Sequence, residues 1–486
     1  MQEKTRLKMN RNEIRPRVDD TSVTSLIQQN TMNSCSFPLF LFVIFLRCLS
    51  STGAATCHPD DKAGLLAFKS GITQDPSGIL SSWQKDIDCC SWYGIFCLPT
   101  IHGDRVTMMA LDGNTDVGET FLSGTISPLL AKLHHLNEIR LTNLRKITGS
   151  FPHFLFKLPK LRTVYLENNR LSGPLPANIG ALSNLEILSV AGNRFSGSIP
   201  SSMSKLTSLL QLKLNGNRLS GIFPDIFKSM RQLRFLDLSS NRFSGNLPSS
   251  IASLAPTLST LEVGHNKLSG TIPDYLSRFE LLSALNLSRN GYTGVVPMSF
   301  ANLTNIIFLD LSHNLLTGPF PVLNSLGIEY LHLSYNRFHL ETIPEWVTLS
   351  KFIYSLKLAK CGIKMSLDHW MPADTSFYHH IDFSENEISG SPIRFFNQMD
   401  FMVEFHAPGN KLQFDLGKLK FGIFLKTLDL SRNLVFGKVP VTVTRLQTLN
   451  LSQNHLCGKL PSTKFPASAF VDNKCLCGFP LSPCKA

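Results

Sequence analysis

The residues of this sequence with the chemistry for catalysis or metal binding are mainly histidines, acids and cysteines. Adjacent histidines occur twice, at His134-His135 and at His379-His380. Neither pair has the spacing of a metal site or the partners of a catalytic triad. The glycines are not arranged as a loop that could cradle a phosphate. The sequence therefore predicts a protein that is not an enzyme and that needs no cofactor.

The cysteines gather near the two ends of the chain. Clusters of this kind are typical of disulfide-stapled caps in a secreted protein. Metal binding is the alternative, but Cys475-Leu476-Cys477 lacks the two-residue spacing of zinc ligands and has no histidine cluster beside it. We therefore predict disulfides and no metal, with roughly a hundred pairings open to eight cysteines. The clustered residues are Cys57, Cys89, Cys90, Cys97, Cys457, Cys475, Cys477 and Cys484.

A short apolar run near the N-terminus indicates secretion. Residues 37–49 are almost wholly apolar, too few to span a bilayer but typical of a signal-peptide core. Small residues follow, so we expect cleavage after Ala55. We predict an upstream extension over residues 1–31, a signal peptide over residues 32–55, and a secreted mature chain without a membrane span.

A repeated pattern determines the architecture that must position any site. From Leu161 onward, L-x-x-L-x-L-x-x-N recurs about every 24 residues, which is the range of leucine-rich repeats. Cys361 occupies the Asn position of one repeat, where a buried thiol fits. The recurring residues are Asn169, Asn193, Asn217, Asn241, Asn266, Asn290, Asn314, Asn336, Asn386, Asn410, Asn433 and Asn454.

The spacing of the pattern predicts a solenoid. In each Leu-x-Leu, strand alternation sends both leucines inward and the middle residue outward. One repeat cannot bury its leucines alone, so neighbours must stack. We expect the Asn side chains to pair buried backbone groups, because an unpaired group costs about 1–3 kcal/mol. The predicted fold is an α/β repeat, a right-handed leucine-rich-repeat solenoid. We predict a cap over residues 56–104, about fifteen repeats over 105–456, and a cap over 457–486.

Two motifs resemble a known family. After the Asn, most repeats continue as x-L-S-G-x-I/L-P, as in Phe195-Ser-Gly-Ser-Ile-Pro200, which resembles the plant-specific class of leucine-rich repeats. The N-terminal stretch around Leu80-Ser-Ser-Trp83 resembles the plant cap family, and we expect Asp60 or Asp61 to cap its first helix. The C-terminal cysteine stretch is similar to the closing cap of polygalacturonase-inhibiting proteins. This resemblance implies the pairs Cys57–Cys89, Cys90–Cys97, Cys457–Cys475 and Cys477–Cys484.

The resemblance predicts the fold more sharply than the partner. Polygalacturonase inhibitors carry fewer repeats, and the G-x-I-P signature decays between residues 337 and 432. Irregular late repeats also resemble the ectodomains of plant receptor-like proteins. The partner expected from the first likeness is a pectin-degrading enzyme of a pathogen, and from the second a receptor kinase ectodomain.

The residues around each Leu-x-Leu are the predicted binding surface on the concave face. Aromatic and charged side chains there are the types enriched in interface hot spots. We expect Asp237, Glu262 and Asp310, beside Phe235 and Phe308, to form the central patch. The alternative is that Asp or Asn before Leu-Ser is the ordinary filling of this strand. The predicted binding residues are Arg140, Tyr165, Lys213, Phe235, Asp237, Glu262, Phe308, Asp310, Tyr330, His332, Lys357 and Asp382.

Three sequons predict glycosylation, at Asn286, Asn302 and Asn450. We expect Asn302 on the outer side of the solenoid. A glycan on Asn286 would obstruct the concave face and move the binding site elsewhere.

The formal net charge of +12 suggests polyanionic surroundings. Solubility alone is the alternative reason for such a charge. We expect acidic pectin of the plant cell wall rather than nucleic acid. The predicted function is a secreted binding scaffold of the apoplast that recognises or inhibits pectin-degrading enzymes. A soluble receptor-like module in peptide or developmental signalling and a structural cell-wall protein are the alternatives.

Overall fold

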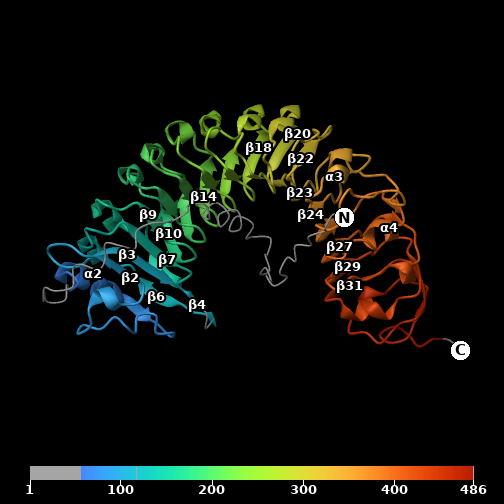
Figure 1. Cartoon of the computed structure of the whole chain (residues 1–486), viewed down its shortest axis with the longest axis horizontal. Coiled ribbons are helices and arrows are strands. Elements are labelled where there is room, and N and C mark those ends of the chain that lie inside the picture. Colours follow the sequence, from blue (N-terminus) through green and yellow to red (C-terminus); the bar gives the residue numbers. More distant parts are fainter. Residues whose placement is uncertain (1–55, 116–117, 485–486) are drawn as a thin grey trace, which may run out of the picture. The chain divides into compact units, whose positions relative to one another are not determined.

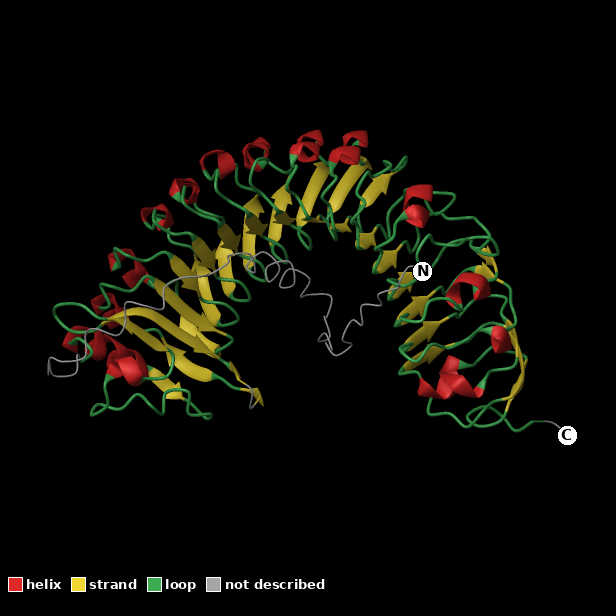
Figure 2. Cartoon of the chain, viewed as in Figure 1, coloured by secondary structure: helices red, strands yellow, loops and turns green. Residues whose placement is uncertain are grey.

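The computed structural model describes residues 56–115 and 118–484. The predicted extension and signal peptide lie outside these residues. Within residues 56–484 the repeats stack in an arc, with one long sheet on the inner side (Figure 1). The short helices lie on the outer side (Figure 2). The predicted leucine-rich-repeat solenoid is confirmed.

The inner sheet has 16 strands. β2 pairs antiparallel with β3 in the N-terminal cap. The other strands are parallel, one per repeat, which agrees with about fifteen repeats. Its strands are β2 (Ile95–Leu98), β3 (Arg105–Asp112), β7 (Glu138–Thr142), β9 (Thr163–Tyr165), β11 (Ile187–Ser189), β13 (Gln211–Lys213), β15 (Phe235–Asp237), β17 (Thr260–Glu262), β19 (Ala284–Asn286), β21 (Phe308–Asp310), β23 (Tyr330–His332), β24 (Ser355–Lys357), β25 (His380–Asp382), β27 (Glu404–His406), β29 (Thr427–Asp429) and β31 (Thr448–Asn450).

The Leu-Ser-Gly segments and the corresponding segments of neighbouring repeats form, with β1 of the N-terminal cap, a second sheet of 10 strands. The glycine of each segment takes a left-handed conformation, as at Gly270 with φ 80°, which favours a residue without Cβ. The strands are β1 (Ile72–Gln74), β6 (Leu122–Thr125), β8 (Arg145–Gly149), β10 (Arg170–Pro174), β12 (Arg194–Gly197), β14 (Arg218–Ile222), β16 (Arg242–Gly245), β18 (Lys267–Thr271), β20 (Gly291–Val295) and β22 (Leu315–Thr317).

The second sheet stops where the signature decays. Between Thr317 and Ser389, a stretch that the structure describes in full, the outer segments make only isolated bridges. Short sheets follow, because Leu-Ser-Gly is replaced by sequences that do not extend side by side. Their strands are β26 (Ser389–Gly390) with β28 (Lys411–Leu412), and β30 (Phe436–Gly437) with β32 (His455–Lys459) and β33 (Cys475–Cys477). β4 (Asn114–Thr115) and β5 (Gly118–Glu119) form a separate hairpin.

Helices are short, because each repeat must turn back within a few residues. The α-helices of the described residues are α2 (Pro59–Ser70), α3 (Glu345–Leu349) and α4 (Ile393–Phe396). The 3-10 helices are η1 (Cys89–Ser91), η2 (Pro128–Lys132), η3 (His153–Lys157), η4 (Ile179–Ala181), η5 (Ser201–Lys205), η6 (Phe227–Ser229), η7 (Ser249–Leu254), η8 (Asp274–Arg278), η9 (Met298–Asn302), η10 (Leu416–Lys418), η11 (Val441–Arg445) and η12 (Ala467–Ala469).

The N-terminal cap closes the core with aromatic rings and a buried ion pair. Trp83 and Trp92 are buried and stack with centroids 5.4 Å apart. The expected acidic helix cap is wrong, because the side chain of His58 accepts from the Asp60 backbone at the start of α2. Asp61 instead binds the guanidinium of Arg105 through both oxygens, at 2.8 and 2.9 Å.

The four disulfides implied by the resemblance are the four pairs in the structure. Cys57 joins Cys89 and Cys90 joins Cys97 in the N-terminal cap. Cys457 joins Cys475 and Cys477 joins Cys484 at the other end. Both ends of the repeat stack are therefore covalently closed.

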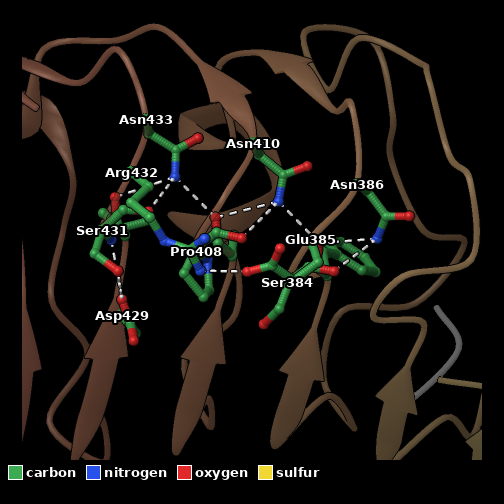
Figure 3. A network of polar contacts seen from close by, with 12 residues as sticks. Ser384, Glu385, Asn386, Pro408, Asn410, Asp429, Ser431, Arg432 and Asn433 are labelled. Atoms are coloured by element: carbon green, nitrogen blue, oxygen red, sulfur yellow. Dashed lines mark hydrogen bonds and ion pairs between the residues drawn. The ribbon is translucent and has the colours of Figure 1, made fainter. Parts of the chain in front are cut away.

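The recurring asparagines form the predicted internal ladder. The Nδ2 of Asn410 donates to the carbonyls of Phe383, Ala407 and Pro408, and its Oδ1 accepts from the Ile388 backbone. Figure 3 shows this arrangement with its neighbours Asn386 and Asn433. One amide thus bridges two repeats.

Cys361 takes the Asn position in the ladder. Its Sγ lies 3.4 Å from the carbonyl oxygen of Leu333, and the side chain is buried. Burial raises the pKa of the Cys361 thiol well above its ordinary range. The structural role expected for this thiol is confirmed.

We expect Asn314→Ala to destabilise the solenoid by about 2–4 kcal/mol, because it leaves buried backbone groups without partners. Asn314 donates to the carbonyls of Leu287, Leu311 and Ser312 and accepts from the Tyr292 backbone. A lower urea midpoint checks this. Asn178→Ala is the matched control, since Asn178 is exposed and makes no capping bond. Equal midpoints for the two variants would remove the energetic role of the ladder.

Candidate functional site

The predicted binding residues lie in two straight rows on the inner sheet. The strands pair without slippage from β7 to β31, so each residue lies beside its counterpart in the next repeat. Asp237 lies beside Glu262, and Asp310 lies beside His332. Because adjacent strands are about 4.8 Å apart, side chains of neighbouring repeats contact one another. The structure thus brings the predicted residues together as rows.

Two members of the row are buried rather than exposed, contrary to the prediction. Asp237 is 5% and His332 6% exposed. The carboxylate of Asp237 turns back onto its own chain, where it accepts from the backbone and hydroxyl of Ser239. The ring of His332 packs edge-on against both Phe308 and Tyr330, and its Nε2 is 2.9 Å from Ser355 Oγ. The side chains of Asp237 and His332 therefore support the concave surface from within and offer little area for contact with a partner.

Five Asp/Asn-Leu-Ser segments and Asp382-Phe383-Ser384 share this hydrogen bond. In each, the Oδ1 accepts from the backbone of the serine two residues later. The alternative interpretation, that Asp and Asn are the ordinary filling of this strand, therefore has a structural basis at these positions. They are Asp237, Asn286, Asp310, Asp382, Asp429 and Asn450.

Basic side chains at the N-terminal end of the row lie over rings. The guanidinium of Arg140 is 4.5 Å from the ring centroid of Tyr165. The ammonium of Lys213 is 5.0 Å from that of Phe235. Such pairs are worth about 0.5–1 kcal/mol at exposed sites, and they present a mixed cationic and aromatic surface. These four residues are half-buried or exposed, as a contact surface requires.

Glu262 is the electrostatic centre of the predicted patch. Burial raises the pKa of its carboxyl to about 8, and the neighbouring Asp237 adds to the shift. Burial likewise raises the pKa of Asp237, opposed by Ser239 and Lys213. Burial also acts on Asp310, but His332, 3.8 Å away, and Ser312 outweigh it and lower the pKa of Asp310. The patch therefore holds one carboxyl that carries a proton near neutral pH.

The C-terminal part of the row carries Lys357 and Asp382, which lie side by side on β24 and β25. His380 Nδ1 is 3.0 Å from Glu404 Oε2 in the neighbouring row. That hydrogen bond is the main reason why the pKa of Glu404 is lowered. Charges of both signs thus continue along the face.

A rim row was missed by the sequence analysis. The residue before each ladder Asn has positive φ, and it is glycine at 192, 216 and 409. Bulky residues elsewhere project beside the inner sheet: His313 stacks on Tyr335 with centroids 4.5 Å apart. Arg432 reaches across Gly409 to pair with Glu385, as Figure 3 shows. The sequence signal that could have revealed this row is the contrast between glycine and large side chains at the position just before the ladder Asn.

The sequons differ in setting. Asn302 ends η9 and is exposed. Asn286 and Asn450 are half-buried, and each accepts hydrogen bonds from the serine of its own sequon. Glycosylation at all three stays a prediction.

Among the described residues, the acid and thiol groups close enough to hold a metal ion are Cys57, Asp88, Cys89 and Cys90. Their sulfurs are in disulfides, and Asp88 accepts from the backbones of Cys57 and Cys90. These atoms are therefore committed to the cap. In residues 56–115 and 118–484, none of the helices has the length and apolarity to cross a membrane.

Known families match the parts of the chain that carry the motifs. The leucine rich repeat N-terminal domain matches residues 58–98. Leucine rich repeat families match residues 160–182, 183–243, 256–316 and 445–463. The chain thus contains a leucine rich repeat N-terminal domain and leucine rich repeats, and it resembles the ectodomains of plant leucine-rich-repeat proteins.

Its relatives include both inhibitors and receptors. It is 32% identical over 129 residues (26% of the chain) to polygalacturonase inhibitor 2 of Arabidopsis thaliana. It is 33% identical over 146 residues (29%) to receptor-like protein 7 and over 143 residues (28%) to DNA damage-repair/toleration protein DRT100 of the same plant. The matches span 37%, 14% and 37% of those relatives' lengths, respectively.

Solved structures show the same relationship. The ectodomain of the Arabidopsis receptor kinase GASSHO1/SCHENGEN3, in complex with CASPARIAN STRIP INTEGRITY FACTOR 2, is 26% identical with a TM-score of 0.59. That match covers 75% of this chain and 51% of the other. The peptide hormone receptor RGFR1 with RGF2 is 25% identical with a TM-score of 0.55, covering 70% and 62%. The chain is thus related to inhibitors and to receptor ectodomains.

Proposed function

We propose that this protein is a secreted, non-enzymatic binding scaffold of the plant apoplast that recognises a pathogen's pectin-degrading enzyme. The observation that carries the proposal is the group of half-buried charged and aromatic side chains on the concave strands, such as Lys213, Phe235 and Glu262, in a chain similar to a polygalacturonase inhibitor. The mechanism is steric: the concave face docks on the enzyme and covers its substrate cleft. No group of the scaffold enters the reaction.

Acidic pectin would hold the scaffold near the enzyme's substrate. The basic formal charge of +12 supports this retention. Charge-based retention weakens as salt rises, because the screening length falls from about 10 Å at 0.1 M to about 3 Å at 1 M. Elution from wall extracts by salt is therefore part of the proposal.

We expect Lys213→Ala with Glu262→Ala to weaken inhibition of a fungal polygalacturonase at least about tenfold, since hot-spot truncations cost about 2 kcal/mol or more. These two residues are half-buried and lack the serine hydrogen bond that fixes Asp237. A reducing-sugar assay against inhibitor concentration measures the effect. The control is Lys205→Ala with Glu280→Ala, two exposed residues outside the inner sheet.

Unchanged inhibition by the concave variant would move the site off this face. If the unmodified protein inhibits no polygalacturonase, the inhibitor proposal fails. The second candidate is a soluble receptor-like module, favoured by the likeness to ectodomains solved with peptide ligands. Co-capture of a receptor kinase ectodomain from plant extracts would support that role.

A further inference from the structure

A chain of aromatic contacts crosses six successive repeats in the C-terminal half. Successive ring centroids are 5.7, 5.3, 4.3, 6.2 and 5.5 Å apart. Each contact joins one repeat to the next. We name this set the aromatic track; it consists of Phe308, Tyr330, Tyr354, His379, Phe401 and Phe424.

The track moves obliquely off the concave face. Its first two rings occupy the first residue of β21 and β23. Tyr354 and His379 lie one residue before β24 and β25, and Phe401 and Phe424 lie three residues before β27 and β29. The place of the ring relative to the start of its strand therefore shifts after every second repeat, first by one residue and then by two. Only the beginning of the track belongs to the concave site described above.

The track is open to solvent at its outer end. Phe401 is 45% and Phe424 44% exposed, and the inner members are half-buried. Phe352 and Phe377, with centroids 5.5 Å apart, are comparably exposed in the same flank of neighbouring repeats. Half-exposed rings in consecutive repeats leave a continuous apolar strip, which in a monomer marks an interaction surface.

The ring orientation selects the chemistry of the partner. From Tyr354 to Phe424 the rings are stacked, with interplanar angles of 21°, 19° and 23°. Tyr354 and His379 overlap face to face at 4.3 Å, whereas the two outer contacts, at 6.2 and 5.5 Å, are offset, so ring edges are open to solvent there. Ring edges carry positive partial charge, which is complementary to carbonyl oxygens.

Two acidic and two basic residues lie close to track residues in the sequence, so their formal charges cancel. Glu329 and Asp400 directly precede track residues, and Lys351 and Lys426 lie within three residues of others. An uncharged chain rich in carbonyl groups therefore complements the track better than an acidic or a basic one. A polyproline II segment has this chemistry, because its backbone carbonyls have no partners within the segment.

The spacing agrees with the same partner. A polyproline II turn rises roughly 9 Å in three residues. Two repeats of the inner sheet span roughly 9.5 Å, and the track changes position at that interval. Pro-rich segments dock on aromatic-lined surfaces at low entropic cost, because the extended helix is preformed.

We propose that the aromatic track binds an extended proline-rich segment of a partner protein. The track spans five repeat steps, roughly 24 Å, which a polyproline II segment of about eight residues matches. The outer end of the track, at Phe401 and Phe424, lies apart from the Lys213 and Glu262 patch, so the proposal does not depend on enzyme inhibition.

The test is binding of fluorescently labelled nonaproline to the full secreted protein, followed by fluorescence anisotropy. We expect saturable binding that Phe401→Ser with Phe424→Ser weakens at least about tenfold. Phe436→Ser is the matched control, because Phe436 is 43% exposed but lies on β30 of a different sheet. It should bind nonaproline as the unmodified protein does. A labelled Gly-Ser nonapeptide should not saturate.

Thermal unfolding of each variant establishes that the fold is retained, which half-exposed positions should allow. Absence of saturable nonaproline binding by the unmodified protein would overturn the proposal. Equal losses in the Phe401/Phe424 and Phe436 variants would do so too, as would stronger binding of an oligogalacturonide on the same rings. Inhibition assays on the track variant separate this site from the concave patch, since inhibition should persist.

Discussion

Replacing Asp61 by asparagine is expected to destabilise the N-terminal cap by about 3–5 kcal/mol, the usual cost of removing one partner of a buried ion pair. Asp61 is fully buried, and the side chain of Arg105 is 12% exposed. The carboxylate also accepts from the Val106 backbone at 2.9 Å. The substitution leaves the Arg105 guanidinium buried without its counter-charge. It also weakens the connection between α2 and β3, the strand that carries Arg105 and Val106.

Hydrogen exchange followed by mass spectrometry would measure this loss in peptides covering α2. We expect faster exchange there and little change in the distant repeats, because stability in a solenoid is carried mainly by nearest neighbours. Asp60→Asn is the matched control, since the neighbouring Asp60 is 55% exposed in its pair with Lys132. Similar exchange in both variants would show that the Asp61 pair contributes nothing special.

The second large effect concerns pH. Because the folded protein raises the pKa of Glu262 from 4.5 to about 8, it binds a proton over a range in which the unfolded chain has released it. Stability from this group is therefore fully present below pH 4.5 and declines as pH rises toward 8. The decline is on the order of 2–4 kcal/mol, at about 1.4 kcal/mol per pKa unit.

Glu262→Gln removes this dependence, because glutamine stays neutral. Urea midpoints should agree between variant and unmodified protein at pH 4.5 and separate toward pH 8, where the variant is the more stable. Glu280→Gln serves as control, since Glu280 is exposed outside the inner sheet. If the two profiles for Glu262 stay parallel from pH 4.5 to 8, its carboxyl is not held protonated by the fold.

The sequence predicted the stacking because the residues that stack are periodic. Leucines at a two-residue step fill the core, and the ladder Asn recurs with them, so the inner sheet followed directly. Even the interruption of the outer sheet could be seen in the loss of Leu-Ser-Gly after residue 337. The prediction for the start of α2 was wrong. His58 makes the local capping bond, whereas Asp61 pairs with the distant Arg105, and the sequence signature of a helix start does not distinguish these two roles.

The site was less predictable, because alternation gives the direction of a side chain and not its neighbours. Asp237 and His332 point to the concave side, but Ser239 and the rings of Phe308 and Tyr330 cover them. The aromatic track was also missed, since its members occupy three different repeat positions. No single column of the aligned repeats contains them all.

The hydrogen bond between Asp or Asn and the serine two residues later divides the concave row into restrained and unrestrained positions. At Asp237, Asp382 and Asp429 a change of residue removes a bond that shapes the strand end. Among the described residues, Lys213 and Glu262 make no such bond, so a substitution there removes none. Substitutions at Lys213 and Glu262 can therefore change the chemistry of the concave face while the hydrogen bonds at the ends of the strands stay in place.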